Sequence, residues 1–121
     1  IMPYLASANF NLVIDAARTL GMLNDKPAAE KIAPLLIDRH WEVRSIAVTA
    51  LGCIDRDGYE ADLIRALQDR EWQVRYNAAA ILKDSPDIEG IRKVVVATGD
   101  RYALEMLEFM TQSNELWRQA E

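Results

Sequence analysis

Two stretches of the chain are near-copies of each other, 31 residues apart. Residues 36–52 and 67–83 are identical at eight of 17 paired positions, which include Trp41 with Trp72 and Arg44 with Arg75. A fixed period of this length is typical of repeat proteins, in which small units stack in a row and each contacts only its neighbours. Such stacks usually present binding surfaces rather than catalytic pockets, so the period constrains the architecture more than it constrains the chemistry.

The same period continues in both directions from this pair. Going back 31 residues from Trp41 reaches Phe10, and Gly52 falls on Gly21. The segment 32–36 aligns with 1–5, 63–67 and 94–98, and its proline aligns with the proline of the first copy. The copies divide a single domain, residues 1–121, into units at about 1–21, 22–52, 53–83 and 84–121.

Each unit is predicted to contain two helices, which we call A and B. The A helix is expected to follow a capping residue whose side-chain oxygen accepts hydrogen bonds from free amides, and to end near Gly21 or Gly52. The capping residues are Ser7, Asp38, Asp69 and Asp100. The B helix is expected to begin after turns that carry proline, at 25–27 and 85–86. The β-like run 94–96 lies in register with helical copies and is therefore predicted to be helical as well.

Composition excludes several classes of protein. Apolar residues make up 50% of the chain and charged residues 27%, as in ordinary soluble domains, and the net charge is −5. The chain has no long basic run, which argues against nucleic acid as a ligand. No apolar run is long enough to span a membrane, so direct membrane insertion is not expected. A lone cysteine fits a reducing compartment, which predicts a cytoplasmic protein or a soluble domain of a membrane-anchored one.

The two side chains best suited to metal or thiol chemistry are isolated. His40 is the only histidine and Cys53 the only cysteine. They belong to opposite ends of one predicted helix, about 20 Å apart at ~1.5 Å per residue. His40 is therefore interpreted as a solvated side chain and Cys53 as an ordinary small apolar residue. We expect no enzymatic activity, no metal site and no cofactor.

The two ends of the chain suggest a fragment. Ile1 aligns with the middle of a B helix, so the chain opens inside a unit, and we expect it to be a piece of a longer array or multidomain protein. The polar segment 114–121 is expected to form an end cap or a junction, because stacked repeats need polar ends.

The repeated motif resembles a known family. Asp-x-x-Trp-x-Val-Arg-x-x-Ala-x-x-x-Leu occurs at 38–51 and 69–82, and this pattern looks like a HEAT repeat. More narrowly, it resembles the short prokaryotic HEAT-like repeats named for phycobilisome (PBS) lyases. The resemblance implies an all-α, armadillo-type fold: a right-handed α-α superhelix of about three to four 31-residue, two-helix repeats in a bacterial protein.

The resemblance also implies a role for the repeated charged residues. HEAT-like arrays use an Asp–Arg ladder to fix the stacking of repeats, which here would comprise Asp38, Arg44, Asp69 and Arg75, each arginine reaching the cap of the adjacent repeat. Anion binding by the arginines is the alternative. Trp41 and Trp72 are predicted to be buried at the joints between repeats, where a tryptophan can bury roughly 150–250 Å². A partial role as exposed aromatic contacts is the alternative for them.

The solvent face of the B helices is the predicted binding surface, because these helices line the concave side of HEAT-like solenoids. Its polar and turn-forming residues are Lys31, Pro34, Asp62, Arg65, Arg92 and Lys93. Lys31, Asp62 and Lys93 share one repeat position and would form a row. The predicted function is a scaffold or adaptor that binds a segment of a partner protein, and an ordinary solvated face is the simpler interpretation.

Two other functions remain open at this stage. One is a phycobilin lyase-like subunit that binds a tetrapyrrole or its carrier protein. The other is a structural or regulatory domain of a membrane-anchored signalling protein. A change in visible absorption on mixing with a bilin would favour the lyase-like function.

Overall fold

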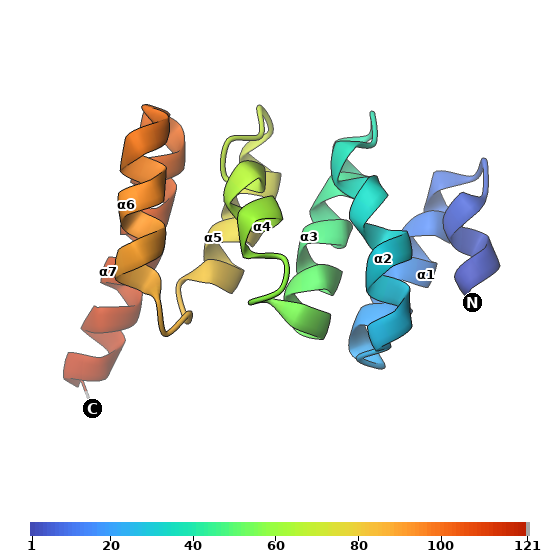
Figure 1. Cartoon of the computed structure of the whole chain (residues 1–121), viewed down its shortest axis with the longest axis horizontal. Helices are drawn as coiled ribbons and strands as arrows, with labels where there is room; N and C mark the ends of the chain where they lie inside the picture. The colour runs from blue at the N-terminus through green and yellow to red at the C-terminus, as the bar shows by residue number, and fades with distance from the viewer. Residues whose placement is uncertain (121) are drawn as a thin grey trace.

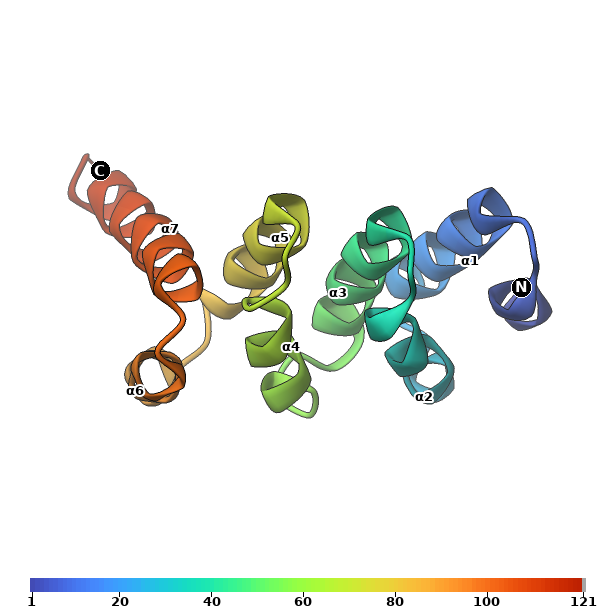
Figure 2. The same cartoon turned by 90° about the horizontal axis from the view of Figure 1, so that it is seen from above.

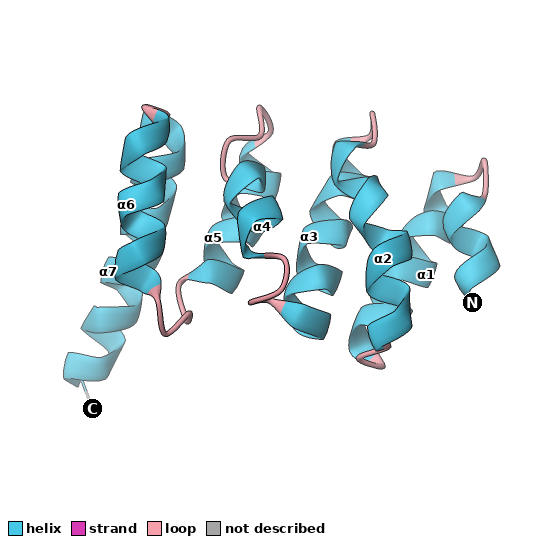
Figure 3. Cartoon of the chain, in the orientation of Figure 1, coloured by secondary structure: helices cyan, strands magenta, loops and turns pink. Residues whose placement is uncertain are grey.

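The chain folds into an open stack of helix pairs. In the computed structural model, residues 1–120 are described for the backbone and 1–112 for the side chains. Every regular element in these residues is helical (Figure 3). The pairs lie side by side in a row with free ends, and the two termini lie at opposite ends of it (Figure 1). The predicted all-α solenoid is therefore confirmed.

The helices form two layers, which Figure 2 shows from above. The A layer contains α1 (Phe10–Met22), α3 (Trp41–Asp55), α5 (Trp72–Leu82) and α7 (Arg101–Ala120). The B layer contains η1 (Met2–Ala6), η2 (Lys26–Ala28), α2 (Ala29–Ile32), η3 (Ala33–Ile37), α4 (Glu60–Ala66) and α6 (Ile88–Thr98). Each A helix packs against the A helix of the next unit, α1 on α3, α3 on α5 and α5 on α7.

The second B helix is interrupted by its prolines. Residues 26–37 form two 3-10 segments, η2 and η3, around the four residues of α2. Pro34 has no backbone N–H and cannot donate the hydrogen bond that would continue α2. By contrast, the β-branched run 94–96 lies inside α6 as predicted, and Gly99 ends this helix with φ of 73°.

Three of the four predicted caps stand two residues too early. Asp38 Oδ1 accepts from the backbone N–H of His40 at 2.9 Å, and Asp69 Oδ1 accepts from that of Glu71 at 2.9 Å. Ser7 Oγ likewise accepts from the N–H of Asn9 at 3.1 Å. The residues at the N-cap positions of α1, α3 and α5 are Asn9, His40 and Glu71. Ser7, Asp38 and Asp69 therefore brace the turn before the helix, and their prediction as N-caps was wrong.

Asp100 occupies the predicted capping position. It directly precedes α7, and its Oδ1 accepts from the N–H of Ala103 at 3.1 Å. The turn into α7 is thus shorter than the turns into α3 and α5. This difference moves the carboxylate of Asp100 relative to those of Asp38 and Asp69.

Gly21 and Gly52 were predicted to lie near the ends of their helices, which holds for Gly21, and both lie at the contact between A helices. α1 ends one residue after Gly21, whereas α3 continues three residues past Gly52 to Asp55. A Cβ at Gly21 would lie 2.9 Å from Ala50 Cα, and one at Gly52 would lie 2.6 Å from the Ile81 side chain. Glycine at these positions lets neighbouring A helices approach closely.

The core runs through the stack as two apolar clusters. One gathers buried residues of α1, α2 and α3, including Leu20, Ile32 and Leu51. The other gathers buried residues of α4 to α7, including Leu67 and Leu107, and it also takes Val48 from α3. α3 therefore contributes to both clusters and joins the two halves of the stack. Within the described residues, no helix combines the length and apolar character needed to cross a membrane.

Candidate functional site

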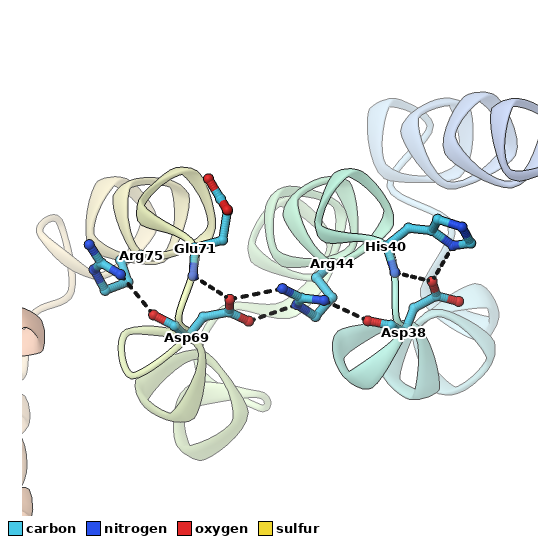
Figure 4. Close-up of polar contacts among 6 residues, drawn as sticks. All are labelled: Asp38, His40, Arg44, Asp69, Glu71 and Arg75. Carbon is cyan, nitrogen blue, oxygen red and sulfur yellow. Dashed lines mark hydrogen bonds and ion pairs between the residues drawn. The ribbon is translucent and has the colours of Figure 1, made fainter.

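The repeated polar residues form a chain of contacts along one edge of the stack (Figure 4). Arg44 Nε and Nη2 donate to Asp69 Oδ2 and Oδ1, at 2.8 and 3.1 Å. Its Nη1 donates to the carbonyl oxygen of Asp38 at 2.8 Å. One guanidinium thus links the turn before α3 with the turn before α5.

This contact is buried and has two parallel hydrogen bonds. The side chain of Arg44 is 7% exposed and that of Asp69 is 13% exposed. Paired N–H···O bonds between guanidinium and carboxylate are stronger and more directional than a single neutral bond. Burial makes the loss of either partner expensive, because the other charge would then be buried alone. The contact therefore holds two units in a fixed register.

Arg75 occupies the same repeat position but lacks the carboxylate. Its Nη1 donates to the carbonyl oxygen of Asp69 at 2.9 Å, as Arg44 does to Asp38. Its Nε is buried and has no hydrogen-bond partner within residues 1–112. The guanidinium lies over the ring of Tyr102, 5.6 Å from the centroid.

The predicted ladder contact from Arg75 to the next repeat's aspartate is therefore not formed. Asp100 stands directly before α7 and binds the helix amide of Ala103 instead. Asp69 stands two residues further from its own helix, where the carboxylate reaches Arg44. The shorter turn before α7 is the physical reason for the difference.

His40 differs from the expectation of a solvated side chain. The His40 side chain is only 37% exposed, its ring stacks on Phe10 with centroids 5.1 Å apart, and Nδ1 lies 3.1 Å from Asp38 Oδ1. His40 therefore packs between α1 and α3 rather than being fully solvated. Cys53 is exposed, not part of the apolar core. Among the described residues, no group of three or more His, Cys, Asp or Glu side chains is placed to hold a metal ion.

The two repeated tryptophans are not buried between adjacent repeats. Trp41 is 40% exposed and Trp72 is 55% exposed, so the prediction of burial was wrong. Each is the first residue of its A helix, and much of each side chain is open to solvent. Trp72 instead packs edge-on against Tyr76, with ring centroids 6.1 Å apart.

An aromatic groove lies between α5 and α7, with a volume of about 290 Å³. We use this name for the surface lined by Trp72, Arg75, Tyr76, Tyr102, Glu105, Met106 and Phe109. Tyr102 is 68% exposed and Phe109 is 60% exposed. Large apolar side chains gathered on an exposed surface mark a candidate interaction site.

A second hollow adjoins the aromatic groove, and we call it the arginine pocket. It is also about 290 Å³ and is lined by Gln68, Asp69, Arg70, Arg75, Asp100 and Tyr102. Arg75 and Tyr102 line both hollows, so the two form one continuous surface.

The six residues predicted on the B face fall into separate surroundings. Pro34, Asp62 and Arg65 line a groove of about 290 Å³ between η3 and α4, which we call the B groove. Asp62 and Arg65 form an ion pair with each other. Lys31 on α2 and Lys93 on α6 are exposed and do not line this groove.

Arg92, the sixth predicted residue, is already paired. It donates to Glu89 on its own helix and to Glu108 Oε1 on α7, the latter at 2.6 Å. The hydrogen bonds to Glu89 and then Glu108 raise the pKa of the Arg92 guanidinium above its ordinary value. Arg92 therefore ties α6 to α7, and its charge is balanced within the chain.

The sequence did contain a pattern for the aromatic groove, but the repeat alignment obscured it. Trp72 and Tyr76 are four residues apart, and Tyr102, Met106 and Phe109 follow the spacing of one helix face. The last copy departs from the repeat motif after Asp100, so these α7 residues had no aligned counterparts that would assign them a role.

Comparison with known proteins gives one family. A family model described as HEAT repeats matches residues 29–114, which is most of the chain. No curated protein matches the sequence.

Proposed function

The chain belongs to the HEAT-repeat family, and we propose that it is a non-enzymatic module that binds a segment of another protein. HEAT repeats commonly serve as scaffolds for protein interactions. No cofactor is required for this function. The helix stack supplies a preformed surface, so a partner segment binds without much ordering of the receptor.

The aromatic groove is the observation that carries this proposal. Tryptophan, tyrosine and arginine are the residues most enriched among those that dominate binding energy at interfaces. The groove combines Trp72, Tyr76, Tyr102 and Arg75 on two helices that pack directly against each other. The two helices that form the groove also carry side chains that are fully buried in the core, including Val74 of α5 at 1% and Leu107 of α7 at 0% exposure.

The B face is a second candidate surface for the same function. The B groove offers the exposed Ile37 and Pro34 beside the Asp62–Arg65 pair. Lys31 and Lys93 provide further positive charge on the B layer. The B layer would form the concave side of the stack if the stack curves as related arrays do. The aromatic groove is favoured because three of the five charged residues predicted on the B face, Asp62, Arg65 and Arg92, form ion pairs within the chain.

The test is a display library of random peptides about 15 residues long, selected against the folded domain. We expect selected peptides to lose about 10-fold or more in affinity when Trp72 is replaced by alanine, since hot-spot residues have effects of this size. The matched variant K31E/K93E is expected to bind within about twofold of the wild type, because rim charges away from the contact contribute little. Affinities are measured by fluorescence anisotropy.

Other outcomes of this selection point elsewhere. Loss of binding in K31E/K93E, with Trp72→Ala unaffected, would move the site to the B face. Failure to select any peptide would contradict the proposed function. A change in visible absorption on mixing with a bilin would favour the lyase-like alternative instead.

Trp72→Ala is suitable for this test because its effect on stability is expected to be moderate. Truncation of a buried tryptophan typically lowers the free energy of unfolding by ~3–5 kcal/mol. Trp72 is 55% exposed, and we expect a loss of roughly 1–2 kcal/mol, since only about half of that contact area is at stake. Urea denaturation followed by circular dichroism checks this value. A loss as large as that expected for a buried tryptophan, ~3–5 kcal/mol, would show that the ring supports the core.

A further inference from the structure

One of the arginines that line the arginine pocket has a buried hydrogen-bond donor without an acceptor among the described side chains. Arg44 and Arg75 share one repeat position, and both donate Nη1 to the carbonyl six residues earlier, at 2.8 and 2.9 Å. Arg44 completes its bonding with the two oxygens of Asp69. Arg75 has no such carboxylate, and its buried Nε is unsatisfied among the described side chains.

An unsatisfied buried donor is unfavourable, and more so when it carries charge. Comparison of Arg75 with Arg44 in the same chain indicates which chemical group would satisfy this donor. A carboxylate placed against Arg75, as Asp69 is placed against Arg44, would satisfy Nε and add a second charge-assisted hydrogen bond.

The charges around the pocket also favour an incoming anion. Arg70 is exposed and forms no ion pair with any described residue. Asp69 is already held by Arg44 and by the N–H of Glu71. Asp100 is the one remaining carboxylate that lines the pocket, and its Oδ1 is engaged by the Ala103 amide. Two guanidinium groups thus line the pocket, and among the described residues Asp100 is the one lining carboxylate that forms no ion pair with an arginine, in a chain whose net charge is −5.

The position of the arginine pocket beside the aromatic groove indicates which residues would lie next to the carboxylate in a bound segment. Arg75 and Tyr102 line both the arginine pocket and the aromatic groove. We propose that the bound segment carries an aspartate or glutamate next to apolar or aromatic residues. Its carboxylate binds Arg75 and Arg70, while its apolar side chains enter the groove between α5 and α7. This inference rests on the proposed function and names the chemistry of the partner at that site.

The peptide selection provides the first test. We expect the selected sequences to be enriched in aspartate or glutamate at a fixed distance from an aromatic or large aliphatic residue. The tightest peptide is then synthesised with its acidic residue unchanged, replaced by the matching amide, and replaced by phosphoserine. The amide version is expected to bind about 10-fold more weakly, since hydrogen bonds to charged groups are worth about that much.

Variants of the protein identify the arginine. Arg75→Met keeps the aliphatic stem but removes the donors, and it is expected to weaken the acidic peptide about 10-fold without further weakening the amide peptide. The matched control is Arg65→Met, an arginine on the B layer that pairs with Asp62; it is expected to leave both peptides within about twofold. Asp100→Asn removes the opposing charge and keeps a capping side chain, and it is expected to strengthen binding of the acidic peptide.

The outcomes separate this inference from the proposed function. If peptides bind the groove and Trp72→Ala weakens them, but the acidic and amide versions bind equally, the carboxylate inference is overturned and the function stands. Tight binding by the phosphoserine peptide alone would also overturn it, in favour of phosphate recognition. If Arg75→Met does not fold, the comparison of acidic and amide peptides on the wild-type protein still decides. A domain that selects no peptide overturns both the function and the inference.

Discussion

Replacement of Asp69 with alanine is expected to lower the free energy of unfolding by about 3–5 kcal/mol, the range typical of removing one partner from a buried ion pair. The side chain of Arg44 is 7% exposed, and its guanidinium would lose both carboxylate oxygens at once. The N–H of Glu71 would lose its acceptor in the same step. Urea denaturation of the variant, followed by circular dichroism, measures the change.

The chain offers a matched control for this effect. Asp62 also pairs with an arginine, but the Arg65 side chain is 69% exposed and the pair lies within one helix. Asp62→Ala is therefore expected to lower the free energy of unfolding by about 1 kcal/mol or less. Equal losses in the two variants would show that the Arg44–Asp69 contact does not hold the units together.

A double variant distinguishes the contribution of the ion pair from the cost of leaving one buried charge without its partner. Replacing Arg44 with methionine and Asp69 with leucine removes both charges and keeps apolar volume. Such replacements of buried ion pairs are often neutral or stabilising, so we expect the double variant to be more stable than Asp69→Ala alone. The result would show whether the pair contributes net stability or mainly fixes the register of the units.

The period of 31 residues was enough to predict the architecture, because each copy repeats the same requirement for burial. The run 94–96 shows this most clearly: its β-branched residues favour strand, yet its register with Ile32 and Leu63 favours helix, and α6 is helical. Propensity is a weak preference that packing overrides. The interruption of the second B helix at Pro34 follows from local chemistry, although the prediction treated that segment as one helix.

The details of the site depended on features that a repeat alignment does not contain. Alignment places Arg44 and Arg75 at one position, but the turn into α7 is shorter, so Asp100 caps a helix where Asp69 binds an arginine. It likewise predicts that Trp72 is buried between units, although the residue is 55% exposed. Exposure depends on how far the adjacent unit reaches, which is a property of the assembled stack.

The same holds for the charges of the B face. Arg92 was predicted as a binding residue because the helix pattern leaves it outside the apolar stripe. In the folded chain it pairs with Glu108, which is 16 residues away and belongs to the last A helix. A contact of this kind is specific to one pair of helices, so the repeat provides no information about it.

Loss of packing at the centre of the stack is expected to lower the free energy of unfolding most. Replacing Leu51 with alanine is expected to lower the free energy of unfolding by about 2–5 kcal/mol, through lost burial and the cavity left behind. Leu51 is 0% exposed and packs in the apolar cluster of α1, α2 and α3. The matched control is Leu12→Ala on α1, a leucine that is 42% exposed, for which we expect about 1 kcal/mol or less.

The position of Leu51 also determines how the loss should spread. α3 places Leu51 in one cluster and Val48 in the other, and the stability of a repeat stack depends on contacts between adjacent units. Amide hydrogen exchange in Leu51→Ala is therefore expected to accelerate in α1 and α3 more than in α6 and α7. Uniform acceleration across all A helices would instead show that the stack unfolds as one cooperative unit, with α3 transmitting the loss to both halves.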